Sequence, residues 1–287
     1  MECAKKVLSF GEIVWDIFEN EKTLGGAPLN FAYYCSKLGA NAKILSAVGT
    51  DANGDAALEM AQKAGIDTSL VERIDGAETG RVLVRQTGAN HAFEICSPAA
   101  WDSIELSPAA EEFAAKADAF CFGTLSQRSL ISAGTLKKII SLLPGSCLKI
   151  FDANLRQNFF TKDTIEFCAA SADMLKLNDD ELAVFRRIFS MDGYSDAHTC
   201  EKLLRKFGLA RILLTCGSKG YSIFDKSGKS ISAAANPVDL VDSVGAGDSF
   251  TAAFTMSVLN GEDSAVAAAK AQGLAEKVCS RRGALCL

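Results

Sequence analysis

The sequence predicts an α/β fold in which a mainly parallel sheet is flanked by helices on both faces and accompanied by a small β-sheet. Two observations indicate the main sheet: short apolar runs alternate with longer helical patterns, and these runs are apolar almost throughout. Such strands are typical of parallel sheets that helices cover on both faces. The third observation indicates the small sheet, because residues 77–102 contain alternating polar and apolar side chains around a TGAN turn.

The strands of the main sheet are expected in six apolar runs, and helices in five other segments. The strand candidates are residues 7–14, 42–48, 118–122, 148–152, 173–177 and 211–215. The helix candidates are residues 28–38, 54–64, 129–142, 179–189 and 197–207. No linker rich in Pro, Gly or Ser and no internal repeat interrupts the chain, so residues 1–287 are predicted to form a single domain.

The small sheet is expected from two stretches that break this alternation. Residues 12–26 contain WDIFENEKTLGG, which is typical of a strand and a turn, and residues 77–102 contain a hairpin. Together they would form a lid over a cleft, or else a hairpin with no role in a site. Arg85 and His91 lie on this lid, and they would either favour an acidic substrate or pair with a nearby acid or water.

The composition excludes several classes of function. The net charge of -5 argues against nucleic acid or an anionic membrane as the main partner. No apolar run approaches the roughly 20 residues of a membrane span, and the opening MECAKKVLSF has no secretory signal pattern. The 10 cysteines include no C-x-x-C pair and the 2 histidines lie far apart, so a zinc site is not expected. Reduced thiols in a cytoplasmic protein are the expected state.

Polar residues follow the predicted strands at five places. Ligands of an open α/β sheet bind beyond the carboxyl ends of the strands, so these side chains are expected to share one cleft. Turns and helix caps also favour Asp, Asn and Gly, so a single cluster would mean little. The clusters are Asp16 with Gly26 and Asn30; Asp152 with Asn154 and Arg156; Asn178 with Glu181; Thr215 with Gly217 and Gly220; and Asp242 to Asp248.

The stretch VDSVGAGDSFTAAF, residues 241–254, predicts an anion-binding turn before a helix. Apolar residues from Phe250 onward repeat at helical spacing, so the helix is expected to begin near Gly247. The amides of Gly245, Ala246 and Gly247 would then converge on an anion, because glycine lets phosphate oxygens approach the backbone closely.

Asp248 lies in the first turn of that helix, where its charge would repel a resident phosphate. One interpretation satisfies both features: the phosphate is in transit, and Asp248 faces the group that receives it. A carboxylate that accepts the hydroxyl proton is adequate for phosphoryl transfer from ATP, where positioning and charge stabilisation do most of the catalysis. The alternative is that Asp248 only caps its helix.

With these residues assembled, the chain resembles the ribokinase (PfkB) family of carbohydrate kinases and is most similar to its fructokinases. Two signatures bracket the chain, GGAPLNFAYYCSKLGANAKILSAVGTDANGD and DSVGAGDSF. FDANLR, KLNDDE and TCGSKG are similar to inner motifs of the family and stand in the expected order. GEIVWD and FEICSPAAWD are similar to fructokinases in particular. The resemblance covers nearly the whole chain and implies a ribokinase-like fold with a small β-sheet lid.

The resemblance implies a role for each polar cluster. Asp248 would be the catalytic base, and the turn before it the anion hole. Asp16, Gly26 and Asn30 would bind sugar hydroxyls, since carboxylate and amide groups can hold vicinal hydroxyls by paired hydrogen bonds. Arg156 would contact phosphate or substrate.

The same resemblance implies how ATP and its ions would be held. Asn178 and Glu181 would hold hydrated Mg²⁺, which keeps most of its waters in protein sites. Lys176 would contact the phosphates, or it would be a surface charge at a strand end. The nucleotide site would be lined by Thr215, Gly217 and Gly220. A monovalent cation, K⁺, would lie near Asp242 and Ser280, which match the family's cation loop loosely.

The resulting interpretation is an ATP-dependent kinase that phosphorylates a free sugar, with fructose converted to fructose 6-phosphate. Other acceptors of the same class are 2-keto-3-deoxygluconate, ribose or a nucleoside. The rival from another class is a catalytically silent sugar sensor, against which the intact Asp248 and its glycines argue. The expected partners are the sugar and ATP, and the resemblance also implies a homodimer formed through the lid.

Overall fold

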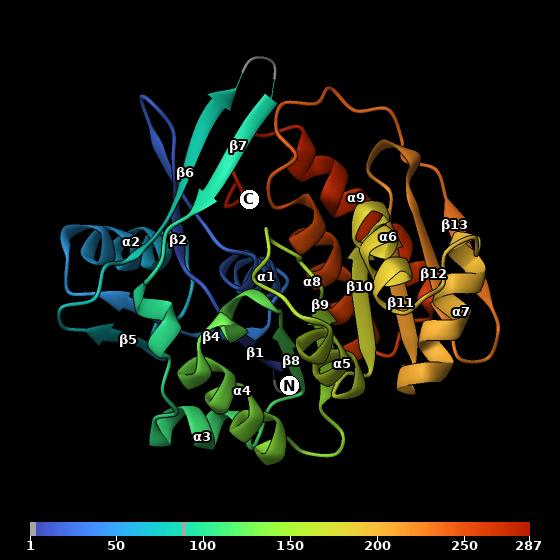
Figure 1. Ribbon diagram of the computed structural model, residues 1–287, viewed down its shortest axis with the longest axis horizontal. Coiled ribbons are helices and arrows are strands. Elements are labelled where there is room, and N and C mark those ends of the chain that lie inside the picture. The colour runs from blue at the N-terminus through green and yellow to red at the C-terminus, as the bar shows by residue number, and fades with distance from the viewer. Residues whose placement is uncertain (1–3, 88–89) are drawn as a thin grey trace.

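The computed structural model describes residues 4–87 and 90–287 and contains two sheets (Figure 1). The strands of the main sheet are β1 (Lys6–Phe10), β4 (Asn41–Gly49), β5 (Val71–Ile74), β8 (Ala119–Phe122), β9 (Leu148–Asp152), β10 (Met174–Asn178), β11 (Arg211–Thr215), β12 (Tyr221–Asp225) and β13 (Ser230–Ala233). Their order is β13-β12-β11-β10-β9-β8-β1-β4-β5. Neighbours are parallel from β11 to β5, and the pairs β11–β12 and β12–β13 are antiparallel. The predicted mainly parallel sheet is confirmed.

Helices cover both faces of this sheet. The α-helices are α1 (Ala27–Lys37), α2 (Ala52–Lys63), α3 (Pro108–Ala114), α4 (Leu130–Leu142), α5 (Lys162–Ala170), α6 (Asp179–Ile188), α7 (Asp196–Phe207), α8 (Ala246–Leu259) and α9 (Ser264–Cys279). The short 3₁₀ helices are η1 (Ala100–Ser103), η2 (Leu125–Arg128) and η3 (Gly217–Lys219). One core contains buried residues of α1, α2, α8 and α9, and the other contains those of α3 to α7.

Successive residues of a strand contribute to these two cores in turn. Leu213 of β11 packs with α8 and α9, whereas Ile212 and Leu214 pack on the opposite face. This follows from the period of two in a strand, and burial of both faces explains the nearly continuous apolar runs in the sequence. The same alternation decides toward which helices a polar residue in a strand points.

The five predicted helices and five of the six predicted strands are found within two residues of the expected bounds. The first strand, expected over residues 7–14, is wrong in its extent. β1 ends at Phe10, and Gly11 has a φ of 145°, a conformation that favours glycine. From there the chain leaves the main sheet, and Val14 begins a strand of the second sheet.

The second sheet has four strands in the order β3-β2-β6-β7. They are β2 (Val14–Ile17), β3 (Lys22–Gly25), β6 (Gly80–Thr87) and β7 (Asn90–Ile95). It is formed by the two stretches that the sequence predicted, and it stands at one side of the main domain (Figure 1). We call it the lid. Residues 88 and 89 of its TGAN turn, and the side chains of Arg85 and His91, lie outside what the structure describes.

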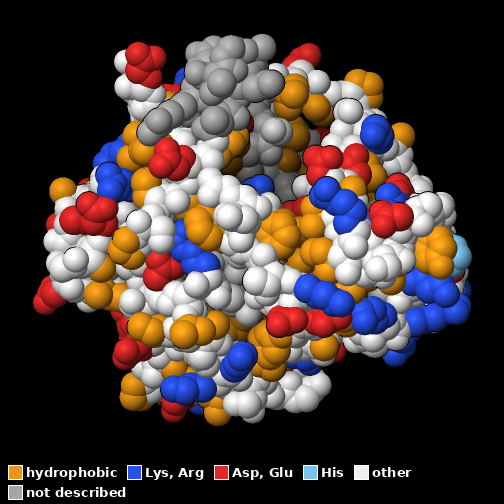
Figure 2. Space-filling model, in the orientation of Figure 1, with side chains coloured by type: hydrophobic (Ala, Val, Ile, Leu, Met, Phe, Trp, Pro, Cys, Tyr) orange, Lys and Arg blue, Asp and Glu red, His pale blue; other side chains and the backbone are white. Residues whose placement is uncertain are grey.

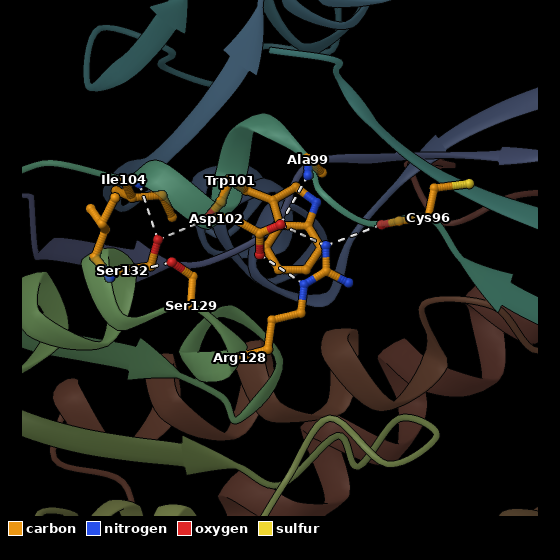
Figure 3. Close-up of polar contacts among 9 residues, drawn as sticks. Cys96, Ala99, Trp101, Asp102, Ile104, Arg128, Ser129 and Ser132 are labelled. Atoms are coloured by element: carbon orange, nitrogen blue, oxygen red, sulfur yellow. Dashed lines mark hydrogen bonds and ion pairs between the residues drawn. The ribbon is translucent and has the colours of Figure 1, made fainter.

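A buried ion pair joins the lid to the main domain (Figure 3). Arg128, at the end of η2, donates from Nε and Nη2 to the two carboxylate oxygens of Asp102, at 2.7 and 2.9 Å. Its Nη2 also donates at 3.0 Å to the carbonyl of Cys96, the residue after β7 ends. The guanidinium carbon lies 3.8 Å from the centroid of the Trp101 ring. One arginine therefore holds both the end of the lid hairpin and the η1 turn.

Candidate active site

The helix that the glycine-rich turn predicts begins at Ala246. Gly245 precedes it with a φ of 81°, and a Cβ there would lie 3.0 Å from atoms of Ala284, so only glycine fits. The N–H of Ser249 makes the first helical hydrogen bond, to the carbonyl of Gly245 at 2.9 Å. The N–H of Ala246 donates to the carbonyl of Ser243 at 3.2 Å. The N–H of Ala246 is thus already paired, whereas the amides of Gly247 and Asp248 precede the helical ladder, where an anion can bind. The anion hole of Gly245, Ala246 and Gly247 stays a prediction.

Asp248 lies half-buried in this first turn. Its Oδ2 accepts a hydrogen bond of 2.7 Å from Nδ2 of Asn30, in the first turn of α1. Burial raises the pKa of Asp248 above its ordinary value, while Lys176, Asn30 and Arg156 act in the opposite direction. The carboxylate is thus fixed in orientation and kept more basic than an exposed aspartate, as proton transfer from a hydroxyl requires.

Lys176 lies on the other side of the same turn. Its Nζ stands 3.2 Å from the place that a Cβ on Gly247 would occupy. It also forms an ion pair of 3.1 Å with Asp152 Oδ1, and both side chains are 8% exposed. The alternative of a surface charge at a strand end is therefore wrong, because Lys176 is buried in the middle of β10.

The predicted sugar-binding residues lie on β2 of the lid and at the start of α1. Asp16 belongs to β2, and Gly26 and Asn30 begin α1. Gly26 has a φ of 119°, and a Cβ there would lie 2.4 Å from the carbonyl oxygen of Glu12, so the turn requires glycine. Burial raises the pKa of Asp16 to about 6, against the effect of Arg156. Asp16 and Asn30 thus offer hydrogen-bonding groups from the lid and from α1, and their joint contact with a sugar stays a prediction.

Glu12 is a buried acid that the sequence analysis missed. Burial raises its pKa to about 7, and the backbone N–H groups of Glu12 itself and of Ala27 stabilise the charged form. It lines a small pocket together with Asp152, Asn154 and several apolar side chains. The available signal was a glutamate inside the apolar run SFGEIVW, where burial of an acid demands an explanation.

Arg156 reaches the cleft from the loop after β9. It is exposed, and its charge lowers the pKa values of Glu12, Asp16 and Asp248. The loop is unusual, since Asn154 has a φ of 37° and lies in the left-handed region. Such backbone conformations cluster at functional sites. On the face seen in Figure 2, the surface is hollowed between the lid and the half of the molecule that carries α8 and α9.

The two residues predicted to hold Mg²⁺ form the N-terminal cap of α6. Asn178 Oδ1 accepts from the N–H of Glu181 at 2.7 Å, and Glu181 Oε2 accepts from the N–H of Asn178 at 2.8 Å. Glu181 Oε1 accepts from the N–H of Leu155 at 2.9 Å. Each oxygen keeps a free lone pair, so these residues fit contact with a hydrated Mg²⁺ through its waters better than direct coordination. The ion itself stays a prediction.

The predicted nucleotide-binding residues lie beside that cap. Thr215, the last residue of β11, is the register partner of Asn178 on β10. Gly217 begins η3 and has a φ of 53°. A Cβ on Gly220 would lie 1.9 Å from the carbonyl oxygen of Ala233, so this turn packs directly on β13. The strand ends bring these residues together, and their contact with ATP stays a prediction.

Asp242 connects the loop before α8 to the end of α9. Its two carboxylate oxygens accept from the N–H groups of Val244 and Gly283, both at 3.0 Å. Its own N–H donates to the carbonyl of Cys279 at 3.2 Å. Ser280 follows Cys279, but its hydroxyl donates to Lys277. The two segments of the predicted cation loop are adjacent, and the K⁺ site stays a prediction.

Several known kinases are similar to this chain in sequence or in fold. A sugar kinase of Pyrococcus horikoshii is 26% identical over 264 residues, covering 88% of this chain and 82% of the relative. Its crystal structure in complex with ATP has a TM-score of 0.82 at 25% identity and covers 97% of this chain and 94% of that one. The probable fructokinase-3 of Arabidopsis thaliana is 27% identical (88% and 78% covered). The 5-dehydro-2-deoxygluconokinase of Clostridium beijerinckii is 24% identical (84% and 74%).

The class is therefore that of a carbohydrate kinase with the ribokinase-like fold. The model of the pfkB family of carbohydrate kinases matches residues 1–286, and the chain belongs to this family. The resemblance that the sequence motifs indicated is confirmed. Among the residues that the structure describes, no helix is long and apolar enough to cross a membrane.

Proposed function

We propose that this carbohydrate kinase transfers the γ-phosphoryl group of ATP to a hydroxyl of a free sugar, and that fructose is the acceptor, giving fructose 6-phosphate. The observation that carries the proposal is the position of Asp248. It lies half-buried in the first turn of α8, near the Lys176 ammonium and bonded to the Asn30 amide. A base, a cation and backbone N–H groups thus surround one point.

In the proposed reaction, the sugar hydroxyl oxygen attacks the γ-phosphorus as its proton passes to the Asp248 carboxylate. The bond from the γ-phosphorus to the bridging oxygen breaks, and its electron pair leaves with ADP. The amides of the turn before α8 and the Lys176 ammonium stabilise the charge on the moving phosphoryl group. Mg²⁺, when bound with ATP beside Asn178 and Glu181, neutralises charge on the β- and γ-phosphates.

The lid is proposed to exclude water from this reaction. Asp16 stands on the lid, so a sugar that binds Asp16 and Asn30 together favours the closed position. Closure then removes water that would otherwise accept the phosphoryl group.

The proposal has three further parts. A K⁺ ion binds near Asp242, and the protein is located in the reducing cytoplasm, where its thiols stay free. The chain forms a dimer through the lid, as the resemblance implies.

Fructose is proposed over an acidic sugar because the described residues offer few cations at the sugar end. Asp16 and Glu12 are acids, and Arg156 is the exposed cation whose charge acts on both. The fructokinase name of the Arabidopsis relative supports the same choice. The name of the Clostridium relative requires that 5-dehydro-2-deoxygluconate be tested as well.

The test is ADP production by the purified protein with Mg²⁺-ATP and a panel of acceptors. The panel contains fructose, ribose, 2-keto-3-deoxygluconate, 5-dehydro-2-deoxygluconate and adenosine. We expect turnover with fructose at least about 10-fold above any other acceptor, which corresponds to about 1.4 kcal/mol of transition-state discrimination. Turnover with another member of the panel would support the proposed kinase activity but would show that fructose is not the preferred acceptor. Silence with every acceptor, while ATP still binds, would favour a sugar sensor.

A further inference from the structure

Asp152 and Lys176 are brought together by the register of the main sheet. They are direct partners on the parallel strands β9 and β10. Leu175 and Leu177 lie in the core on the side of α3 to α7, so Lys176 between them points to the other face, toward α1 and α8. Phe151 lies in the same core as these leucines, so Asp152 points toward α1 and α8 as well. Sheet pairing alone thus places an acid and a base side by side beneath α8.

The pair is buried and holds the ammonium against the first turn of α8. Nζ of Lys176 is 3.1 Å from Asp152 Oδ1, with each side chain 8% exposed. The same Nζ lies 3.2 Å from the place of an added Cβ on Gly247. Burial alone would lower the pKa of Lys176, but Asp152, Glu181 and Asp248 outweigh it and raise the pKa above its usual value. The ammonium is therefore charged.

We propose that Asp152 is a positioning residue for phosphoryl transfer: it holds the Lys176 ammonium beside Gly247, where the ammonium contacts the moving phosphoryl group. This inference rests on the proposed function. It gives a role to the buried pair of Asp152 and Lys176, which proton transfer to Asp248 does not require. An ammonium has three N–H donors, so one can serve Asp152 while two remain for phosphoryl oxygens.

The physical reason for such a residue is the flexibility of lysine. Its side chain has a long flexible stem and a compact charge, and ordering it costs up to about 2 kcal/mol of conformational free energy. A partner that already holds the ammonium in the ligand-free protein removes that cost from the reaction. A cation that is placed in advance in a site without water stabilises developing negative charge without reorganisation.

A different role for Asp152 is direct contact with the sugar, because it lines the pocket beside Glu12 and Asn154. The two roles differ in whether the effect of substituting Asp152 depends on the presence of Lys176. A residue that acts through Lys176 has no effect once Lys176 is gone, whereas a sugar contact keeps its effect. Non-additivity between the two substitutions therefore separates them.

The experiment is a double-mutant cycle on the full chain with Asp152→Asn, Lys176→Met and the double variant, measured with the acceptor that gives turnover. We expect Asp152→Asn to lower kcat about 10- to 100-fold and Lys176→Met about 100-fold or more, as for loss of one charge-stabilising donor. The double variant should match Lys176→Met within about threefold, and KM for the sugar should change little. Lys202→Met on the exposed face of α7 is the matched control.

Multiplied effects in the double variant, or a raised sugar KM with kcat kept in Asp152→Asn, would overturn the positioning role. Asp152→Glu keeps the carboxylate, so its kcat should exceed that of Asp152→Asn, and equal rates would also overturn it. If the wild-type protein transfers to no acceptor, the proposed function fails by itself. The pair is then judged by calorimetry with Mg²⁺-ATP: weaker binding in Lys176→Met supports the phosphate contact, and unchanged binding overturns it.

Discussion

The pKa of Asp248 is subject to two opposite effects, burial on one hand and its neighbours Asn30 and Lys176 on the other. Burial makes the carboxyl more basic, while the amide of Asn30, at 2.7 Å, and the charge of Lys176 stabilise the carboxylate. The result is a carboxylate that is more basic than an exposed aspartate and is therefore suited to accept a proton as the reaction proceeds. If this is its task, its removal should affect turnover far more than binding.

We expect Asp248→Asn to lower kcat by about 100-fold or more, as for loss of a general base, with sugar affinity within a few-fold of the wild type. Asparagine has the same shape but cannot accept the proton. Steady-state kinetics and sugar binding by calorimetry measure the two quantities. Asp192→Asn, at an exposed position after α6, is the control and should leave both unchanged. A kcat within a few-fold of the wild type would show that Asp248 is not the catalytic base.

Single residues also show where prediction from the sequence ends. Asp248 and the glycine turn were predictable because they lie close together in the sequence, and because glycines followed by apolar residues at helical spacing indicate the start of a helix. The pair of Lys176 and Asp152 was not, because it depends on the register of two strands that are 24 positions apart. Glu12 was missed because it continues an apolar run, and only the structure shows the helix N-terminus that it faces.

At the scale of elements, the lid depends on a joint that the sequence did not predict. Arg128 comes from η2, yet its partners are Asp102 in η1 and the carbonyl that follows β7. Its side chain is 6% exposed and that of Asp102 14%, so neither charge is well solvated alone (Figure 3). The existence of the lid was predictable from alternation in residues 77–102. Its attachment was not, because the arginine lies outside the lid segments.

We expect Arg128→Ala to lower the free energy of unfolding by about 3 kcal/mol or more, because it leaves the Asp102 carboxylate buried without its partner. Urea denaturation measures the loss, and hydrogen exchange should show the largest loss of protection in β6, β7 and η1. Arg205→Ala, on the exposed face of α7, is the matched control. Loss of protection spread evenly over both sheets would contradict a local role at the joint.

At the scale of the whole molecule, the cleft gathers carboxyl groups that the fold keeps more basic than usual. Burial raises the pKa of Glu12 from 4.5 to about 7 and that of Asp152 from 3.8 to about 6. The folded protein then binds more protons than the unfolded chain between these values. Stability therefore decreases as the pH rises from about 4 to about 7 through these groups. Asp51, whose pKa is lowered by hydrogen bonds from Thr79, has the opposite dependence at lower pH.

Because of these pKa values, activity and stability are expected to change in opposite directions as the pH rises. The proposed base must be ionised, so kcat should increase with pH through the raised pKa of Asp248, whereas Glu12 becomes charged and destabilises the fold as the pH rises through its pKa of about 7. We expect Glu12→Gln to raise the free energy of unfolding at pH 8 and to flatten its decrease between pH 4.5 and 7, since glutamine fills the place of the acid without its charge. Urea denaturation across that range measures the slope, with exposed Glu201→Gln as the control. If the free energy of unfolding of Glu12→Gln decreases with pH as steeply as that of the wild type, the pH dependence arises from other carboxyl groups.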